Sequence, residues 1–277
     1  MNYHARMTFP TMFISHGGGP WPWIDEMRRE FARTAAWLAA LPKTLPEQPV
    51  AILSVSGHWE EHDFTVSSAA QPPMIYDYYN FPPHTYQIKY GAQGSPAVAA
   101  RVSELLGNAG IAHRVDASRG FDHGTFVPLG VMYPHADVPV VSMSLRANLD
   151  AREHLRMGAA LQPLRDEGVL IIGSGLSYHN LRAFGPAAKE TSAAFDDWLQ
   201  RALAPANFAE RARALASWES APAARQAHPR EEHLLPLMVA VGAAENDVAT
   251  LVYHEDNFFG GISVSNFQFG AGQLGPH

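Results

Sequence analysis

Four short apolar runs recur along the first two thirds of the chain. They are TMFIS ending at Ser15, VAILSVS ending at Ser56, VPVVSMSL ending at Leu145 and VLIIGSG ending at Gly175. Each run is continuous rather than alternating with polar residues, which is typical of strands that are buried on both faces of a sheet. The pattern therefore predicts a largely parallel central sheet.

Segments with helical periodicity lie between these runs. After Asp25, the apolar residues Met27, Phe31, Ala35 and Leu38 recur at spacings that place them on one side of a helix. Because strands alternate with helices, the chain is predicted to be an α/β protein, a single domain over residues 1–277 in which helices flank the sheet.

Further helices are expected from their end signals. One runs from Pro96 toward Gly110 with Ser95 as its N-cap, and a second begins at Asp150. A longer helical region covers 186–220, and another helix is expected over 228–242, which opens with a proline.

Two other segments have distinct patterns. Residues 71–96 interleave proline and glycine with five tyrosines, which favours either a lid or binding wall, or an excursion whose aromatic rings pack over the core. After Val248, the runs ATLVYH and ISVSNFQF predict edge strands or a hairpin with a glycine-containing loop.

Composition narrows the function classes. With 27 acidic and 20 basic residues the net charge is −7, and no basic run could grip a phosphate backbone, so nucleic acid is not an expected partner. No apolar stretch reaches the roughly 20 residues of a membrane span, and the first residues do not resemble a secretion signal, so a cytoplasmic location without a membrane partner is expected. Since cysteine is absent, a metal would need imidazole, carboxylate or water ligands.

Histidines follow three of the predicted strands, at His16, His58 and His179. In open α/β sheets, ligands bind outside the carboxyl ends of the strands. If the strands are neighbours, their ends lie within about 5–10 Å and the imidazoles can converge on one metal ion. The alternative for any single one is a hydrogen-bonded structural histidine.

A fourth histidine position comes from the predicted helix over 228–242. On a helix, His228 and His233 would lie about 140° apart, so both cannot face one metal. His233, on the same side as Leu237, is the better candidate ligand. His228 is expected to be a cap or a residue that supports the ligands from behind.

Two further segments are weighed for site roles. His123 follows a turn-rich stretch and is expected in the pocket, where Asp122 either fixes its tautomer or is simply solvated. The triplet Gly17–Gly19 lacks the rest of a phosphate-binding motif, so its expected role is a sharp backbone turn beside His16. GSGLS at 173–177 does not match a nucleophile elbow. The remaining histidines are expected to be surface or structural residues: His4, His62, His84, His113, His135, His154, His254 and His277.

Six ordered blocks resemble one known family, the class III extradiol ring-cleaving dioxygenases, and within it the 4,5-DOPA dioxygenase extradiol branch. The blocks are SHGGGPW (15–21), SVSGHWE (54–60), YDYYNFP (76–82), GFDHGTFVPL (120–129), GSGLSYHNL (173–181) and HPREEHLLPL (228–237). The resemblance implies an enzyme that opens the ring of a catechol, DOPA-like, with O2.

The resemblance also implies residue roles. His16, His58 and His233 would hold one divalent metal ion, His179 would be the acid/base residue, and His123 would contact substrate or oxygen. A base whose pKa lies near neutrality suits the removal of a catechol proton, and imidazole has such a pKa without perturbation.

The resemblance indicates the identity of the metal less directly than it indicates the roles of the residues. Many extradiol enzymes bind Fe(II) with two histidines and one carboxylate. Here His233 stands at the third position, as in the DOPA branch, and Glu231 and Glu232 are expected on differently directed helix positions. An all-imidazole set also suits Zn(II), for which His179 is the candidate fourth ligand. We expect Fe(II) as the working metal, with zinc as the ion that purified protein could carry.

Two alternatives remain open from the sequence. The same histidines could activate water for zinc-dependent hydrolysis, with His179 as the base. The second alternative is a non-catalytic binding protein on this fold, like the Memo proteins, because fold alone does not fix function. The rings of Tyr76, Tyr78, Tyr79, Trp21 and Trp59 could line an aromatic pocket or pack in the core.

Overall fold

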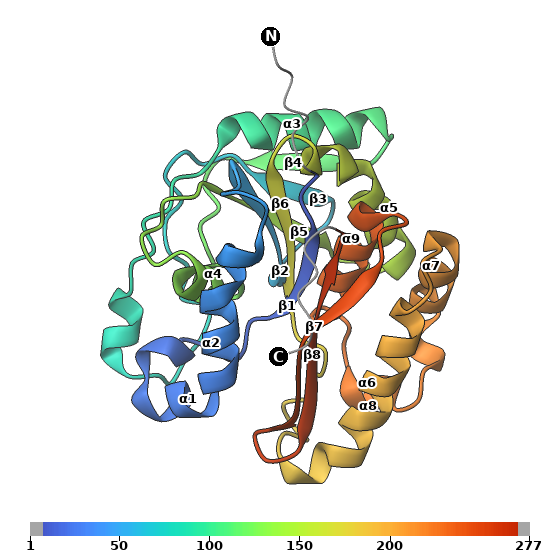
Figure 1. Cartoon of the computed structure of the whole chain (residues 1–277). Helices are drawn as coiled ribbons and strands as arrows, with labels where there is room; N and C mark the ends of the chain where they lie inside the picture. Colours follow the sequence, from blue (N-terminus) through green and yellow to red (C-terminus); the bar gives the residue numbers. More distant parts are fainter. Residues whose placement is uncertain (1–7, 271–277) are drawn as a thin grey trace.

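The computed structural model describes residues 8–270, and its centre is an eight-stranded sheet with the order β4-β3-β5-β2-β6-β1-β8-β7 (Figure 1). The strands are β1 (Thr11–Ser15), β2 (Ala51–Glu61), β3 (Phe64–Ser67), β4 (His113–Asp116), β5 (Val140–Arg146), β6 (Val169–Gly175), β7 (Ala249–Phe258) and β8 (Ile262–Phe269).

The four predicted strands form the parallel centre of this sheet, as β5, β2, β6 and β1. Their residues are almost entirely buried, which explains why the apolar runs are continuous. Strand β2 is longer than predicted because a register shift between Val55 and Glu60 lets it bend and continue to Glu61. The β7–β8 pair is the predicted hairpin, and β8 pairs antiparallel with β1.

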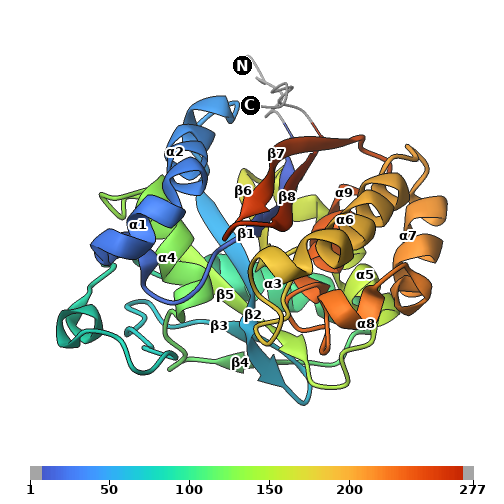
Figure 2. The same cartoon turned by 90° about the horizontal axis from the view of Figure 1, so that it is seen from below.

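Helices cover both faces of the sheet, which confirms the α/β architecture (Figure 2). One face is covered by α1 (Asp25–Glu30), α2 (Ala32–Ala40) and α4 (His123–Met132). The other face is covered by α5 (Ala151–Leu161) and α9 (Leu235–Ala244), and beside these lie α6 (Lys189–Leu203), α7 (Phe208–Ala216) and α8 (Ala224–Ala227). Helix α3 (Pro96–Asn108) covers the end of the sheet formed by β3 and β4. No helix among residues 8–270 is both long and apolar enough to cross a bilayer.

Local signals set several helix ends where the sequence predicts them. The Ser95 hydroxyl accepts a hydrogen bond from the backbone N–H of Val98, and the Asp150 carboxylate accepts one from Glu153. The periodic segment after Asp25 differs in one respect, because non-helical backbone at Phe31 divides it into α1 and α2.

One helix prediction was wrong, and one helix was not predicted. The segment 228–234 forms turns, and α9 begins only at Leu235, because Pro236 rather than Pro229 occupies the first turn of this helix. Helix α4 was not predicted, since its sequence HGTFVPLGVM carries an internal Pro128 and no polar face. It is buried almost all round, and Asp122 caps it by accepting from the backbone N–H of Thr125.

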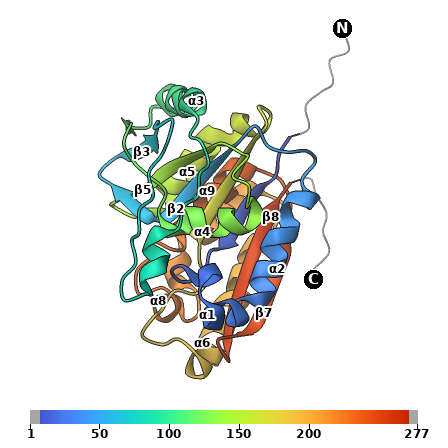
Figure 3. The ribbon, with the colours of Figure 1, turned by 90° about the vertical axis from the view of Figure 1, so that its left-hand side faces the viewer.

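The tyrosine-rich segment 71–96 forms a long loop with only a short 3-10 turn at Pro83–Gln87. Tyr76 and Tyr78 each donate a hydrogen bond to a backbone carbonyl within this loop, at Ile88 and Thr85. Through these two hydrogen bonds the loop is held by its own side chains at the edge of the sheet where the strands end. In Figure 3, α4 crosses in front of the sheet, with α2 beside it next to the β7–β8 hairpin.

Candidate active site

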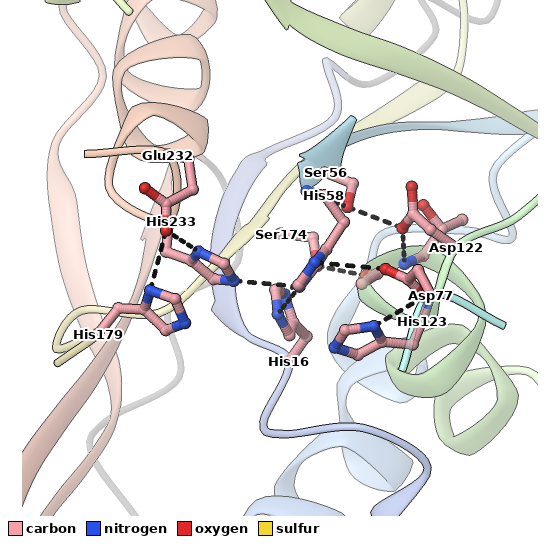
Figure 4. Close-up of polar contacts among 12 residues, drawn as sticks. His16, Ser56, His58, Asp77, Asp122, His123, Ser174, His179, Glu232 and His233 are labelled. Carbon is pink, nitrogen blue, oxygen red and sulfur yellow. Dashed lines mark hydrogen bonds and ion pairs between the residues drawn. The ribbon is translucent and has the colours of Figure 1, made fainter. Parts of the chain in front are cut away.

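Five histidines from distant parts of the chain meet at the carboxyl edge of the sheet (Figure 4). His16 directly follows β1, His58 lies in the bent part of β2, and His179 follows β6. His123 is the first residue of α4, and His233 lies in the turn before α9. The convergence expected from the strand ends is therefore present.

The ring nitrogens lie very close together. His58 Nε2 is 3.0 Å from His16 Nε2 and 3.1 Å from His233 Nε2. The ring of His123 lies 3.9 Å from that of His58, and the His179 ring stacks on His233 at 3.4 Å. Two sets each place three potential ligand atoms within 4.8 Å of one another: His16, His58 and His123, and His179, Glu232 and His233.

A serine behind His16 fixes the orientation of that ring. Pro128 has no N–H to donate to the carbonyl of Gly124 in α4, and this carbonyl accepts the Ser174 hydroxyl at 2.5 Å instead. Since its hydrogen is used, Ser174 Oγ must accept at 3.0 Å from His16 Nδ1. The lone pair of His16 is therefore on Nε2, facing His58.

Two carboxylates each bridge a pair of histidines. Glu232 Oε1 lies 2.9 Å from His233 Nδ1 and 3.0 Å from His179 Nδ1. Asp77 Oδ1 lies 2.9 Å from His123 Nδ1, and its Oδ2 lies 3.3 Å from His58 Nδ1. A carboxylate accepts hydrogen bonds, so His123, His179 and His233 each donate through Nδ1 and keep the lone pair on Nε2. The contact of Asp77 Oδ2 with His58 Nδ1 favours the same tautomer for His58.

The surroundings keep both carboxylates charged. Burial raises the pKa of Asp77, but hydrogen bonds from His123 and the nearby His58 outweigh burial and lower that pKa below its ordinary value. In the same way, burial opposes ionisation of Glu232, while the hydrogen bond from His179 lowers its pKa overall.

Three of the imidazoles are neutral. Burial lowers the pKa of His16 and of His233 well below the ordinary value and that of His58 to about 3, and the neighbouring rings add to this effect. Three Nε2 lone pairs thus face one another without hydrogens between them. Nitrogens that bind one ion at about 2.0–2.1 Å lie roughly 2.9–3.4 Å apart, depending on coordination geometry. The donor set therefore fits one metal cation.

A cavity of about 320 Å³ opens above these rings. Four of the histidines and Asp77 lie at its polar end, and aromatic and aliphatic side chains form the rest of its wall. Tyr78 and Tyr79 line it, as one of the two interpretations of the loop predicts. Trp21 instead stacks on Phe31 in the core. Two other rings also pack outside the cavity, Tyr76 against Phe126 and Trp59 beneath Arg119.

The structure corrects several details of the predicted site. Glu232 is not on a helix, and it points at both His179 and His233. Asp77, rather than Asp122, fixes the tautomer of His123; Asp122 is buried and accepts from Ser56 and Arg119. Asp77 was missed, although it lies in one of the quoted blocks beside tyrosines, because nothing in its local pattern points to His123.

The other histidines lie outside the cluster. His228 is buried at the end of α8, and its Nε2 lies 3.0 Å from the carbonyl oxygen of Ser177, two residues before His179. It supports the loop that carries His179. His154 is buried and hydrogen-bonded to backbone in α5. His4 and His277 lie outside the described residues.

The sheet, the histidine cluster and the aromatic cavity together are typical of an α/β metalloenzyme whose site takes a small molecule. Residues 10–270 match the family model described as the catalytic LigB subunit of aromatic ring-opening dioxygenase. The chain belongs to this family and is a metal-dependent extradiol ring-cleaving dioxygenase, which confirms the resemblance seen in the sequence.

Individual relatives agree over nearly the whole length. The chain is 41% identical to the 4,5-DOPA dioxygenase extradiol of Beta vulgaris, over 94% of this chain and 96% of the relative. It is 33% identical to the protein of the same name from Escherichia coli, over 94% of each chain. A crystal structure of an uncharacterised Escherichia coli protein superposes with a TM-score of 0.75 at 30% identity, and the match covers 95% of this chain and 100% of that one.

Proposed function

We propose that His16, His58 and His233 hold one divalent metal ion, at which a catechol is cleaved by O2. The observation that carries this proposal is the meeting of three neutral Nε2 atoms, with His58 Nε2 3.0 and 3.1 Å from the other two. The Nδ1 atom of each ligand contacts a polar side chain, Ser174 for His16, Asp77 for His58 and Glu232 for His233, as is general for metal-binding histidines.

The proposed working metal is Fe(II). Three imidazoles also bind Zn(II), but zinc has no redox chemistry. When bound, Fe(II) would supply coordination positions for the catechol and O2 and the redox chemistry between them. His179 Nδ1 donates to Glu232, which leaves Nε2 at the cavity as the base that takes a proton from a catechol hydroxyl. The same nitrogen can return the proton when the O–O bond breaks.

The reaction balances without another reductant. One catechol and one O2 give one ring-opened product that contains both oxygen atoms. The carbon–carbon bond next to one hydroxyl-bearing carbon breaks, that carbon becomes a carboxylic acid, and its former neighbour becomes an aldehyde. His123, which is held through Nδ1 by Asp77, lies on the other side of the cluster from His179, where its ring can contact the substrate or O2.

Metal reconstitution tests the proposal. Metal-free protein is loaded anaerobically with Fe(II) or Zn(II) and mixed with aerated catechol, while O2 uptake and the absorbance of the yellow semialdehyde are followed. Activity with Fe(II) alone is expected. Equal activity with zinc would refute the role of iron, and metal-dependent turnover of an ester without O2 uptake would point to hydrolysis, which the family relationship does not favour. A protein that takes up no metal would point to a non-catalytic role.

Single-residue variants separate ligands from the base. His233→Ala is expected to abolish metal binding, whereas His179→Ala should keep the metal and lose at least 100-fold in kcat. The exposed His62 gives the control, His62→Ala, which should change neither. If His179→Ala loses the metal, His179 is a fourth ligand instead. The cytoplasmic location expected from the sequence stays a prediction.

A further inference from the structure

The cavity changes character away from the histidines. Beyond the polar end, its wall is made by side chains such as Met27, Phe81, Leu181, Phe184 and Phe259. Among the described residues that line it, none is lysine or arginine. Asp77, the only acidic side chain among these described lining residues, already accepts a hydrogen bond from His123 and contacts the Nδ1 atom of His58.

The mouth of the cavity is apolar as well. Tyr79 and Leu181 both line the cavity, yet 80% of Tyr79 and 70% of Leu181 is exposed to solvent. Exposed apolar surface that is contiguous with a cavity is a feature of ligand-binding grooves, unlike single exposed apolar residues elsewhere. The exposed apolar surface therefore continues the wall outward from the histidines.

A charged substituent would be poorly placed in this part of the cavity. A carboxylate or ammonium group that leaves water without an ionic partner loses hydration that apolar walls cannot replace. The glycines Gly17–Gly19 also line the cavity, but they offer backbone N–H groups without a net charge. An alkyl or aryl substituent, in contrast, gains from covering the aromatic wall.

We infer that this enzyme prefers a catechol whose ring substituent is uncharged and apolar, an alkyl or aryl group, over one with an amino-acid side chain. The inference rests on the proposed function, since the two hydroxyls must sit at the histidines for the substituent to reach Phe81, Phe184 and Leu181. Leu181 and Tyr79 are then the residues that determine specificity at the mouth.

Three catechols with the same three-carbon chain test this preference: 4-propylcatechol, 3-(3,4-dihydroxyphenyl)propionate and L-DOPA. With Fe(II)-loaded enzyme, kcat/KM is expected to be at least tenfold higher for 4-propylcatechol than for either charged compound. Calorimetry with zinc-loaded protein, in which no turnover is expected, should give the same order of dissociation constants.

A positive charge introduced at the mouth of the cavity should shift the order of kcat/KM toward the negatively charged catechol. Leu181→Arg is expected to raise kcat/KM for the propionate at least fivefold relative to that for 4-propylcatechol. Leu181→Gln is the matched control, since it adds polarity without charge and should not favour the propionate. Because Leu181 is mostly exposed, neither change disturbs the core.

The outcomes separate this inference from the proposed function. If all three compounds are cleaved and L-DOPA equals or exceeds 4-propylcatechol, the apolar preference is refuted while ring cleavage stands. Equal binding of the propionate and 4-propylcatechol would also refute it. If no catechol supports O2 uptake by Fe(II)-loaded enzyme, the proposed function fails, and the inference fails with it.

Discussion

At the scale of single residues, the site depends on groups that stand behind the histidines. Asp77 and Glu232 each connect one proposed metal ligand to one pocket histidine, His58 to His123 and His233 to His179. Both the position of the ligands and the position of the base therefore depend on the same two carboxylates.

Replacing Glu232 tests this dependence. Glu232→Gln keeps the shape but removes the negative charge that holds both Nδ1–H groups. We expect the dissociation constant for the metal to rise about 10- to 100-fold and kcat to fall with metal at saturation. Competition with a chromophoric chelator measures the first effect. The neighbouring Glu231 pairs with Arg225 at the surface, so Glu231→Gln should change neither quantity. Equal effects of the two substitutions would contradict the bridging role.

A buried histidine away from the site predicts a pH effect on stability. His154 Nδ1 donates to the carbonyl of Asp150, and its Nε2 accepts from the backbone N–H of Arg146. Burial lowers its pKa from 6.5 to about 4. The unfolded chain therefore takes up this proton first as the pH falls, and His154 alone lowers the stability of the native state by about 3 kcal/mol from pH 6.5 to 4.

Urea unfolding between pH 7 and 4 measures this loss. Over that interval, the free energy of unfolding of His154→Gln should fall by about 3 kcal/mol less than that of the wild-type protein, because the variant lacks the buried imidazole whose protonation favours the unfolded chain. His228, whose pKa burial also lowers to about 4, is present in both proteins and cancels in the comparison. The exposed His62 supplies the control, and His62→Gln should follow the wild-type curve. Parallel curves for His154→Gln and wild type would contradict the prediction.

At the scale of elements, two glycines set how closely the helices on one face approach. Gly158 in α5 and Gly242 in α9 face each other, and a Cβ on either would overlap a backbone carbonyl of the opposite helix, that of Val239 or Leu155. Helix α9 in turn packs on the sheet, and His233 lies just before its first residue. The helix pair therefore helps to hold that ligand at the sheet edge.

Adding a methyl group at this crossing tests the element-scale argument. Gly242→Ala is expected to lower the free energy of unfolding by about 1–3 kcal/mol, because the helices must separate, even though alanine favours a helix. Gly91→Ala is the control, since nothing lies within 4 Å of a Cβ built there. Chemical denaturation measures both variants. A Gly242→Ala protein as stable as the wild type would show that the contact between the helices is looser.

At the scale of the whole molecule, the proposed ion would join segments that are far apart in the chain. His16 directly follows the first strand, His58 lies in β2 at the centre of the sheet, and His233 lies in the segment before α9. An ion that binds only the folded arrangement stabilises it by mass action.

Removal of the metal should therefore destabilise the fold. Dialysis against a chelator is expected to lower Tm, and free Fe(II) or Zn(II) at about 100 times its dissociation constant should restore roughly 2.7 kcal/mol. Differential scanning calorimetry under anaerobic conditions measures the change. His233→Ala should show no response to added metal, and a response equal to that of wild type would place the ion elsewhere.

The sequence determined most of the architecture and much of the site's membership. Continuous apolar runs predict the central strands, since strands buried on both faces need apolar residues at every position. Because the carboxyl ends of parallel strands meet at one edge, the positions of His16, His58 and His179 after or within such strands predict that they converge. Local capping at Ser95 and Asp150 also needs no tertiary contact.

Tertiary structure alone decided the partners of these histidines. Asp77 reaches His123 from a long loop, and Ser174 is an acceptor for His16 only because Pro128 in another element frees a carbonyl. The sequence predicts a helix at Glu232, which would direct its side chain away from the ligands. The turn before α9 instead directs it at the rings of His179 and His233. Hydrogen bonds between residues distant in the chain leave no periodic trace in sequence, so their partners become visible only when the fold has brought them together.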